Sequence, residues 1–217
     1  MNKLTVKRLQ QRPTSAAHIS DIFNNEGIEW QPIAHANWAD AYPYSPKVSF
    51  RIAHTGDAIL LEYDVEEDSV RAVAAKDNDS VWEDSCCEFF SQPAGDTMYY
   101  NVECNCAGTL LIGSGNEREG RLRAPQEIMN QVDRWSSLGR SPFEEEAGKH
   151  HWQLALILPL TAFFRHQLAS LSGKTIRANF YKCGDKLQKP HFLSWNAIAI
   201  AKPDFHRPDF FGELTFE

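Results

Sequence analysis

Two segments of the chain carry aromatic and polar side chains at a higher density than a buried strand requires. Residues 81–90 read VWEDSCCEFF, and residues 179–208 mix Trp, Phe and Tyr with charged groups. The indoles are Trp82 and Trp195, and Glu88 follows Trp82 by six residues. An indole packs against the apolar face of a pyranose ring, while carboxylates and amides hydrogen-bond to hydroxyl groups. These residue types therefore suit a cleft for a sugar ring between the two segments.

The same residues also have a purely structural interpretation. Both indoles could belong to the hydrophobic core, with Glu88 in an ion pair with Lys182 or Arg177. Spacing alone does not decide between a binding cleft and a filled interior. Solvent access to Trp82 and Trp195 separates the two interpretations, because a covered ring cannot stack on a sugar.

The segments that would position these residues show the period of two that is typical of β-strands. The clearest is 98–106, where Asn101, Glu103 and Asn105 share one face and the alternate residues share the other. Residues 107–108 then predict a tight turn into a second strand. Further strands are expected at 4–8, 48–52, 59–65, 70–74, 86–91, 109–112, 128–136, 150–158, 174–183 and 212–216, and short helices at 14–25 and 161–170.

This pattern predicts an all-β protein, an antiparallel β-sandwich of jelly-roll or immunoglobulin-like kind with one or two short helices. A chain of 217 residues is long enough for one such domain. We expect a single domain over 1–217, in which 1–46 supply an N-terminal strand, a helix and a lead-in to the sandwich. The polar stretch 113–148 is expected to fold over one rim, where binding loops are often found.

The charge of the chain disfavours some classes of partner. Its 29 acidic and 22 basic residues give a net charge of -7, so no broad positive field attracts nucleic acid or anionic lipid. No apolar run reaches the roughly 20 residues of a membrane span. The first eight residues lack the apolar core of a signal peptide. We expect either a cytoplasmic protein or an exported one whose signal has been removed.

The five cysteines have no CxxC spacing; they are Cys86, Cys87, Cys104, Cys106 and Cys183. Neither a disulfide framework nor a zinc knuckle is therefore predicted. We expect reduced thiols that pack as small apolar groups, and no cofactor held by cysteine. A zinc ligand pair formed by Cys104 and Cys106, which share one face of a strand, is the alternative.

Several sequence blocks resemble carbohydrate-binding module family 9, in the DOMON-like superfamily of β-sandwiches. The resemblance covers residues 48–217, above all with stand-alone members from gut Bacteroidetes, and its blocks are VWEDSCCEFF, YYNVECNCAG, NFYKCGD, PHFLSW and PDFHRPDFFGELTF. It implies a non-catalytic sandwich that clamps the end of a glucan or xylan chain between two indoles. By this resemblance Trp82 and Trp195 match the clamp, and Glu88 matches the acidic hydrogen-bonding position. Such modules accompany glycoside hydrolases, so a role in polysaccharide catabolism is also implied.

The resemblance assigns the remaining polar contacts less closely. It implies a polar residue from the strand after the EFF block, and Glu103 and Asn105 fit because they share one face of that strand. Either Asn179 or Lys182 is expected to supply the last contact. Some members hold a structural calcium ion, and residues 77–79 (DND) offer oxygen ligands for one, although a solvated acidic turn is the favoured explanation of these residues.

Three other functions stay open at this point. A glycoside hydrolase needs two carboxylates across the scissile bond, and no motif singles out such a pair among Glu83, Asp84 and Glu88. A partner-binding or structural sandwich would have a filled cleft. A haem-binding relative would use Met and His as axial ligands, and the candidates are Met98, His150, His151, His191 and His206. His206 is instead expected to order a closing loop through a hydrogen bond to backbone.

Overall fold

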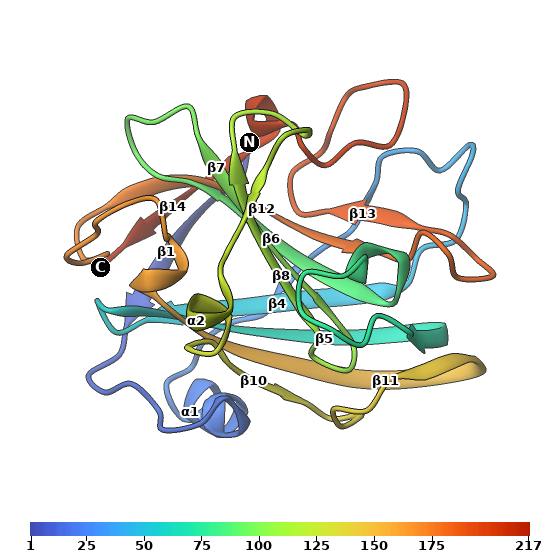
Figure 1. Cartoon of the computed structure of the whole chain (residues 1–217), viewed down its shortest axis with the longest axis horizontal. Helices are drawn as coiled ribbons and strands as arrows, with labels where there is room; N and C mark the ends of the chain where they lie inside the picture. The colour runs from blue at the N-terminus through green and yellow to red at the C-terminus, as the bar shows by residue number, and fades with distance from the viewer.

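The computed structural model describes residues 1–217. Its strands form one continuous 14-stranded sheet that folds into two facing layers (Figure 1). The first layer contains β10 (Asp133–Ser136), β11 (Phe143–Pro159), β5 (Ala58–Ala72), β4 (Lys47–His54) and the short β2 (Gln31–Pro32). The second layer contains β14 (Gly212–Phe216), β12 (Thr175–Cys183), β6 (Cys86–Gln92), β7 (Tyr99–Asn105), β8 (Leu110–Gly115) and β9 (Leu122–Arg123). At its side, β13 (Phe192–Ser194) pairs with β12, and β3 (His35–Ala36) pairs with β13.

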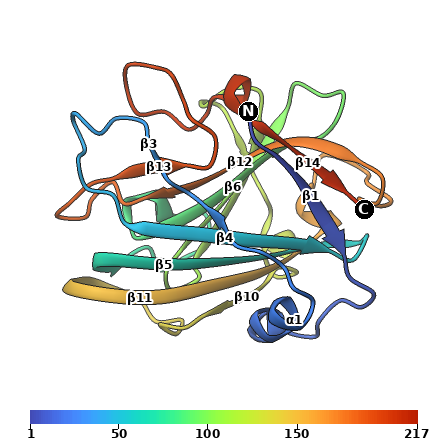
Figure 2. The ribbon, with the colours of Figure 1, turned by 180° about the vertical axis from the view of Figure 1, so that it is seen from behind.

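The N-terminal strand β1 (Lys3–Arg8) joins the two layers. Its first four residues pair in parallel with β14, and its last two pair in parallel with β4 (Figure 2). All other strand pairs are antiparallel. By bonding to both layers, β1 covers strand edges that would otherwise be open.

The main hydrophobic core lies between the layers, because each strand places alternate side chains there. On β7, Val102 and Cys104 join this core, whereas Asn101 and Glu103 lie on the outer face of the second layer. On β6, Phe89 joins the core in the same way. The alternation predicted for residues 98–106 is therefore confirmed, and it sends a row of polar side chains outward.

Short helices and loops cover the two outer faces. The helix α1 (Ile19–Asn25) packs Ile19 and Phe23 on the outer face of the first layer (Figure 1), whereas α2 (Gln126–Met129) buries Met129 in the main core between the layers. Segments 38–42 and 198–211 bring aromatic residues onto the outer face of the second layer. Four 3-10 helices complete the chain, at Ala16–His18, Val81–Glu83, Leu160–Ala162 and Pro208–Phe210. None of the helices combines the length and the apolar character that crossing a membrane requires.

The predicted antiparallel β-sandwich with short helices is confirmed, but some element boundaries differ. Residues 59–65 and 70–72 belong to the single strand β5, because β11 pairs with it from Ala58 to Ala72, and residues 73–74 follow the end of this strand. The helix expected at 161–170 is wrong, since the helical turn ends at Ala162 and Phe163 packs its ring against Tyr100 in the core. The strand expected at 128–136 is wrong in its first half, where α2 ends.

Candidate functional site

A pocket of about 490 Å³ opens on the outer face of the second layer. Its lining comes from β6, β7 and β12, from the 3-10 helix at Val81–Glu83, and from residues 118–123 and 203–206. This volume lies in the range of small-ligand sites in proteins. The sheet therefore supplies a rigid floor, and segments far apart in the sequence supply the walls.

Glu88 and Glu103 form the floor. They are directly opposite each other on β6 and β7, and they are only 3% and 4% exposed. Asn101 Nδ2 donates to Glu103 Oε1 at 2.7 Å, whereas Glu103 Oε2 has no hydrogen-bond partner. Burial, and then the proximity of Glu103, raise the pKa of Glu88 well above its usual value, and burial raises the pKa of Glu103 to about 7. A protonated carboxyl both donates and accepts, so this floor suits hydroxyl groups.

Trp82 forms one wall of the pocket and is half-buried. It lies in the 3-10 helix Val81–Glu83, which the next residue fastens to the end of β5. The carboxylate of Asp84 accepts from the backbone N–H groups of Val73 and Ala74, at 3.0 and 2.9 Å. These bonds hold the indole in place beside the floor.

Phe205 and His206 form a second wall. The Phe205 ring stacks on Tyr181 of β12, with centroids 4.2 Å apart and planes at 7°. His206 Nδ1 lies 2.9 Å from the hydroxyl of Tyr99. Burial, and then nearby arginines such as Arg121, lower the pKa of His206 to about 3, so this ring stays neutral. The wall is therefore aromatic, with a fixed imidazole at its edge.

Charged residues surround the mouth of the pocket. The guanidinium of Arg121 lies 4.1 Å from the centroid of the Tyr99 ring, and its N–H groups bond to oxygens of nearby residues. Arg118 lies 3.6 Å from the carboxylate of Asp204, which links two loops across the rim. Arg123 is exposed and forms no ion pair. Of these three guanidinium groups, that of Arg123 has the most freedom to meet a ligand.

The sequence as a whole matches the family model described as carbohydrate-binding family 9, over residues 17–216. The chain belongs to carbohydrate-binding family 9. Among proteins with curated functions, none matches it in sequence.

Solved structures agree with the family 9 assignment. A candidate carbohydrate-binding protein from Bacteroides uniformis ATCC 8492 is 54% identical, with a TM-score of 0.96 and 99% of both chains covered. A family 9 module from Caldicellulosiruptor kristjanssonii is 13% identical with a TM-score of 0.58 in its glucose complex, and 12% identical with 0.60 in its cellotriose complex. These two matches cover all of this chain and 96% and 94% of the other, and they show that the fold is shared.

Three of the residues selected from the sequence meet in this pocket of the family 9 domain, namely Trp82, Glu88 and Glu103. Trp195 does not, because it is 4% exposed and lies in the core between the layers. Its ring packs edge-on against Phe50 and Phe180, at centroid distances of 5.7 and 5.6 Å. The expectation that two indoles face each other across a cleft is therefore wrong. The backbone N–H of Trp195 donates to Phe180 O, which extends the pairing of β13 with β12 by one residue and places the Trp195 ring on the inner face.

Asn179 and Lys182 also lie outside the pocket lining. Asn179 Oδ1 accepts from Asn196 N at 2.8 Å, and Asn179 Nδ2 donates to Asn196 O at 3.1 Å, so the side chain fastens the segment after β13. Lys182 enters the core, where its Nζ lies 2.9 Å from Glu67 Oε2. Both residues have structural roles in the family 9 fold, and Lys182 pairs with Glu67 instead of Glu88.

Asn105 closes the β7–β8 hairpin and does not line the pocket. Its Oδ1 accepts from Thr109 N at 2.9 Å, and its Nδ2 donates to Asp84 Oδ2 at 2.9 Å. Asn105 therefore supports the turn and the anchor of Trp82.

The acidic turn at 77–79 does not fit a calcium site. Both carboxylate oxygens of Asp77 are engaged by Arg134, at 2.6 and 2.7 Å, and Asp77 Oδ1 also accepts from Leu110 N at 3.1 Å. Calcium needs carboxylate oxygens that are free to coordinate it. The turn instead holds β8 and β10 together through an ion pair.

The sequence reasoning missed several lining residues, including Arg121, Asp185 and Phe205. They lie in loops, where side-chain direction has no fixed period. His206 was expected to bond to backbone, but its Nδ1 partner is the Tyr99 hydroxyl. Of the other haem-ligand candidates, His191 is fully buried with Nε2 2.7 Å from Lys182 Nζ and Nδ1 3.0 Å from a carbonyl oxygen. Neither of these two rings is free to bind a haem iron through those nitrogens.

Proposed function

We propose that the protein binds carbohydrate in this pocket without catalysing a reaction, with one sugar ring or chain end packed against Trp82. The observation that carries the proposal is a half-buried indole in the pocket wall beside two buried carboxyl groups, one with an unpartnered oxygen. A buried polar atom without a partner is costly, and a sugar hydroxyl supplies the missing hydrogen. Family membership supports the same ligand class.

The pairing of groups matches the two sides of a pyranose ring. The apolar C–H face of the ring packs on the Trp82 indole, and hydroxyls at its edge reach Glu88 and Glu103. Burial, and then the nearby Glu103 carboxyl, raise the pKa of Glu88 and so favour its protonated form, which can donate to one hydroxyl oxygen and accept from another. Glu103 Oε2 accepts from a further hydroxyl. Asp185 and Arg123, at the rim, meet the exposed part of the sugar.

The placement of the carboxyls argues against hydrolysis. Glu88 and Glu103 lie on neighbouring strands of one floor, so both approach a ligand from the same side. A glycoside hydrolase needs its acid and its base or nucleophile to flank the scissile bond. The pocket is therefore suited to holding a sugar and not to cleaving it. A role beside the hydrolases of polysaccharide catabolism is part of this proposal.

The first ligands to test are glucose and cello-oligosaccharides, because a family 9 module of similar fold has been solved with glucose and with cellotriose. Xylo- and manno-oligosaccharides complete the panel. Isothermal titration calorimetry measures binding, and assay of reducing ends after long incubation measures cleavage. The proposal expects binding of at least one sugar and no new reducing ends.

The decisive variant is Trp82→Ala, with Trp30→Ala as its matched control. Loss of ring stacking removes about 1–2 kcal/mol, which weakens binding roughly 5- to 30-fold. Trp30 is 37% exposed and lies outside the pocket lining, so its removal leaves the affinity unchanged. Equal loss in both variants, or no heat of binding with any sugar of the panel, would overturn the proposal.

A further inference from the structure

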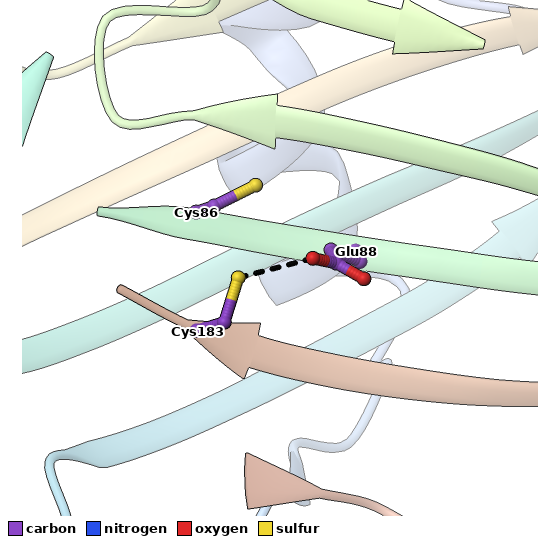
Figure 3. A group of neighbouring side chains, drawn as sticks. All are labelled: Cys86, Glu88 and Cys183. Carbon is purple, nitrogen blue, oxygen red and sulfur yellow. Dashed lines mark hydrogen bonds between the residues drawn. The ribbon is translucent and has the colours of Figure 1, made fainter. Parts of the chain in front are cut away.

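Beneath the sugar pocket, two thiols and a carboxylate converge. Cys86 and Cys183 are directly opposite each other on β6 and β12, and Glu88 lies two residues beyond Cys86 on the same face of β6 (Figure 3). Cys183 Sγ lies 3.0 Å from Glu88 Oε1, and the ligand atoms of all three residues lie within 4.8 Å of one another. All three side chains are buried. The register of the sheet itself therefore brings the three ligand groups together.

We propose that Cys86, Cys183 and Glu88 bind a soft divalent cation of the Zn²⁺ type, with a fourth position open toward the pocket. Two sulfurs and one carboxylate form a donor set that zinc accepts and that calcium or magnesium does not prefer. Tetrahedral zinc takes sulfur at about 2.3 Å and carboxylate oxygen at about 2.0–2.2 Å, so the three groups need to draw together by only about 1 Å.

The residues around the three ligands leave a path for a cation from solvent, and they supply a hydrogen-bond acceptor for a water at the open coordination position. Glu88 and Cys183 both line the pocket, so a cation reaches them from solvent without the sheet opening. Glu103 is 4% exposed and faces Glu88 across the strands, and its Oε2 lacks a hydrogen-bond partner. A water on the cation would donate to this oxygen, as outer partners do in metal sites. A sugar hydroxyl that entered the pocket would compete for the same acceptor.

Neighbouring charges partly offset each other around the three ligands. Asp185 lies near Cys183 and adds negative charge, while Arg121 and Arg123 lie on the Glu103 side. With both thiols and Glu88 deprotonated, the donor set carries three negative charges against two on the cation. The arginines at the rim then balance the remaining charge.

Binding exchanges protons for the cation and involves no redox step. Burial raises the pKa of Cys86 to about 12 and raises that of Cys183 well above its usual value, so both are thiols before binding. The cation loses waters to bulk solvent, two S–H protons leave, and a protonated Glu88 gives up its carboxyl proton as well. Affinity therefore rises with pH.

Cobalt(II) substitution tests the site on the full chain, without sugar and with a phosphine reductant that keeps the cysteines as thiols. Cobalt bound by thiolate absorbs in the near ultraviolet by sulfur-to-metal charge transfer, and tetrahedral cobalt absorbs in the visible. The expected result is one cobalt per chain with both bands, and loss of the bands when one equivalent of zinc is added. Wild-type protein that shows no thiolate band would overturn the proposal.

Variants locate the ligands. Cys183→Ala should weaken cobalt binding by more than the roughly 10- to 100-fold that loss of an outer partner costs. Cys87→Ala is the matched control, because Cys87 is equally buried but faces the core on the other side of β6. Glu88→Gln tests the third ligand in a side chain of the same shape, and it should weaken cobalt binding too. Equal behaviour of Cys183→Ala and Cys87→Ala would refute the site. This readout is independent of sugar, so it fails or succeeds separately from the proposed function.

Discussion

The variant Lys182→Met tests whether Lys182 stabilises the fold or contacts the sugar. Lys182 is fully buried, with Nζ 2.9 Å from Glu67 Oε2, 2.7 Å from His191 Nε2 and 2.9 Å from the carbonyl oxygen of Cys183. Trp152 Nε1 donates to Glu67 Oε1 at 2.7 Å. Burial alone would lower the pKa of Lys182, but the Glu67 carboxylate raises it above the usual value. The ammonium therefore stays charged and ties β12 of one layer to β5 of the other.

Methionine fills a similar volume but leaves the Glu67 carboxylate buried with one donor, from Trp152. Breaking a buried pair by removing one partner costs about 3–5 kcal/mol, a large part of the roughly 5–15 kcal/mol by which proteins are stable. For a chain of this size the melting temperature should fall by about 6–20 °C. Urea unfolding followed by tryptophan fluorescence measures the free energy directly.

The double variant Lys182→Met/Glu67→Gln provides the control. It removes the stranded charge while the glutamine oxygen still accepts from Trp152, so it should regain more than half of the lost stability. Sugar affinity, measured well below the melting temperature, should stay at the wild-type value in both variants. A stability loss below about 0.5 kcal/mol in Lys182→Met, or a weakened sugar affinity in the folded variant, would refute the assignment.

Three further predictions concern the core, the floor of the pocket and the acidic turn. Because the Trp195 ring fills the core, Trp195→Leu should lower the free energy of unfolding in urea by about 2–4 kcal/mol. Sugar affinity should stay unchanged. A loss of affinity with intact stability would contradict this role. Burial raises the pKa of Glu103 from 4.5 to about 7. The contribution of this carboxyl to the free energy of unfolding is therefore full below about pH 4.5 and is lost as the pH rises through 7. In chelator-treated protein, calorimetric melting should therefore show higher stability at pH 5 than at pH 8, and Glu103→Gln should reduce that difference; an unchanged difference would count against the buried carboxyl. Asp77→Asn weakens the ion pair with Arg134, so it should lower the free energy of unfolding in urea by about 1–3 kcal/mol. Added calcium should leave the melting temperature of the wild-type protein unchanged. A rise of the melting temperature with calcium would contradict the ion-pair role of Asp77.

Local sequence patterns predict the sheet and the floor of the site well. A period of two placed Asn101 and Glu103 on one face of β7, and both line the pocket. The same rule applies to β12. Asn179 and Lys182 are three residues apart, so their side chains must point to opposite faces of the sheet. The expectation that only one of the two supplies a contact agrees with this rule. The rule also puts Lys182 on the same face of β12 as Ala178 and Phe180, which both lie in the main core.

The walls of the site depend on contacts between distant segments, which local patterns do not encode. Trp195 lies on the inner face because its backbone N–H bonds to Phe180 O, a pairing set by how β13 docks on β12. Arg121 reaches the rim because it bonds to Tyr99 O and stacks on the Tyr99 ring. Charge and aromatic content marked the 179–208 segment as unusual, but only the folded chain shows that Phe205 and His206, and not Trp195, face the pocket.

A crystal structure with the tightest-binding sugar of the panel tests the central claim most directly. The sugar ring should lie against the Trp82 indole, with a hydroxyl within hydrogen-bond distance of Glu103 Oε2. A sugar held instead in the second cavity of about 330 Å³, beside Tyr44 and Lys149, would contradict the account. So would a ring bound in the first pocket without contact to either Trp82 or the two floor carboxyls.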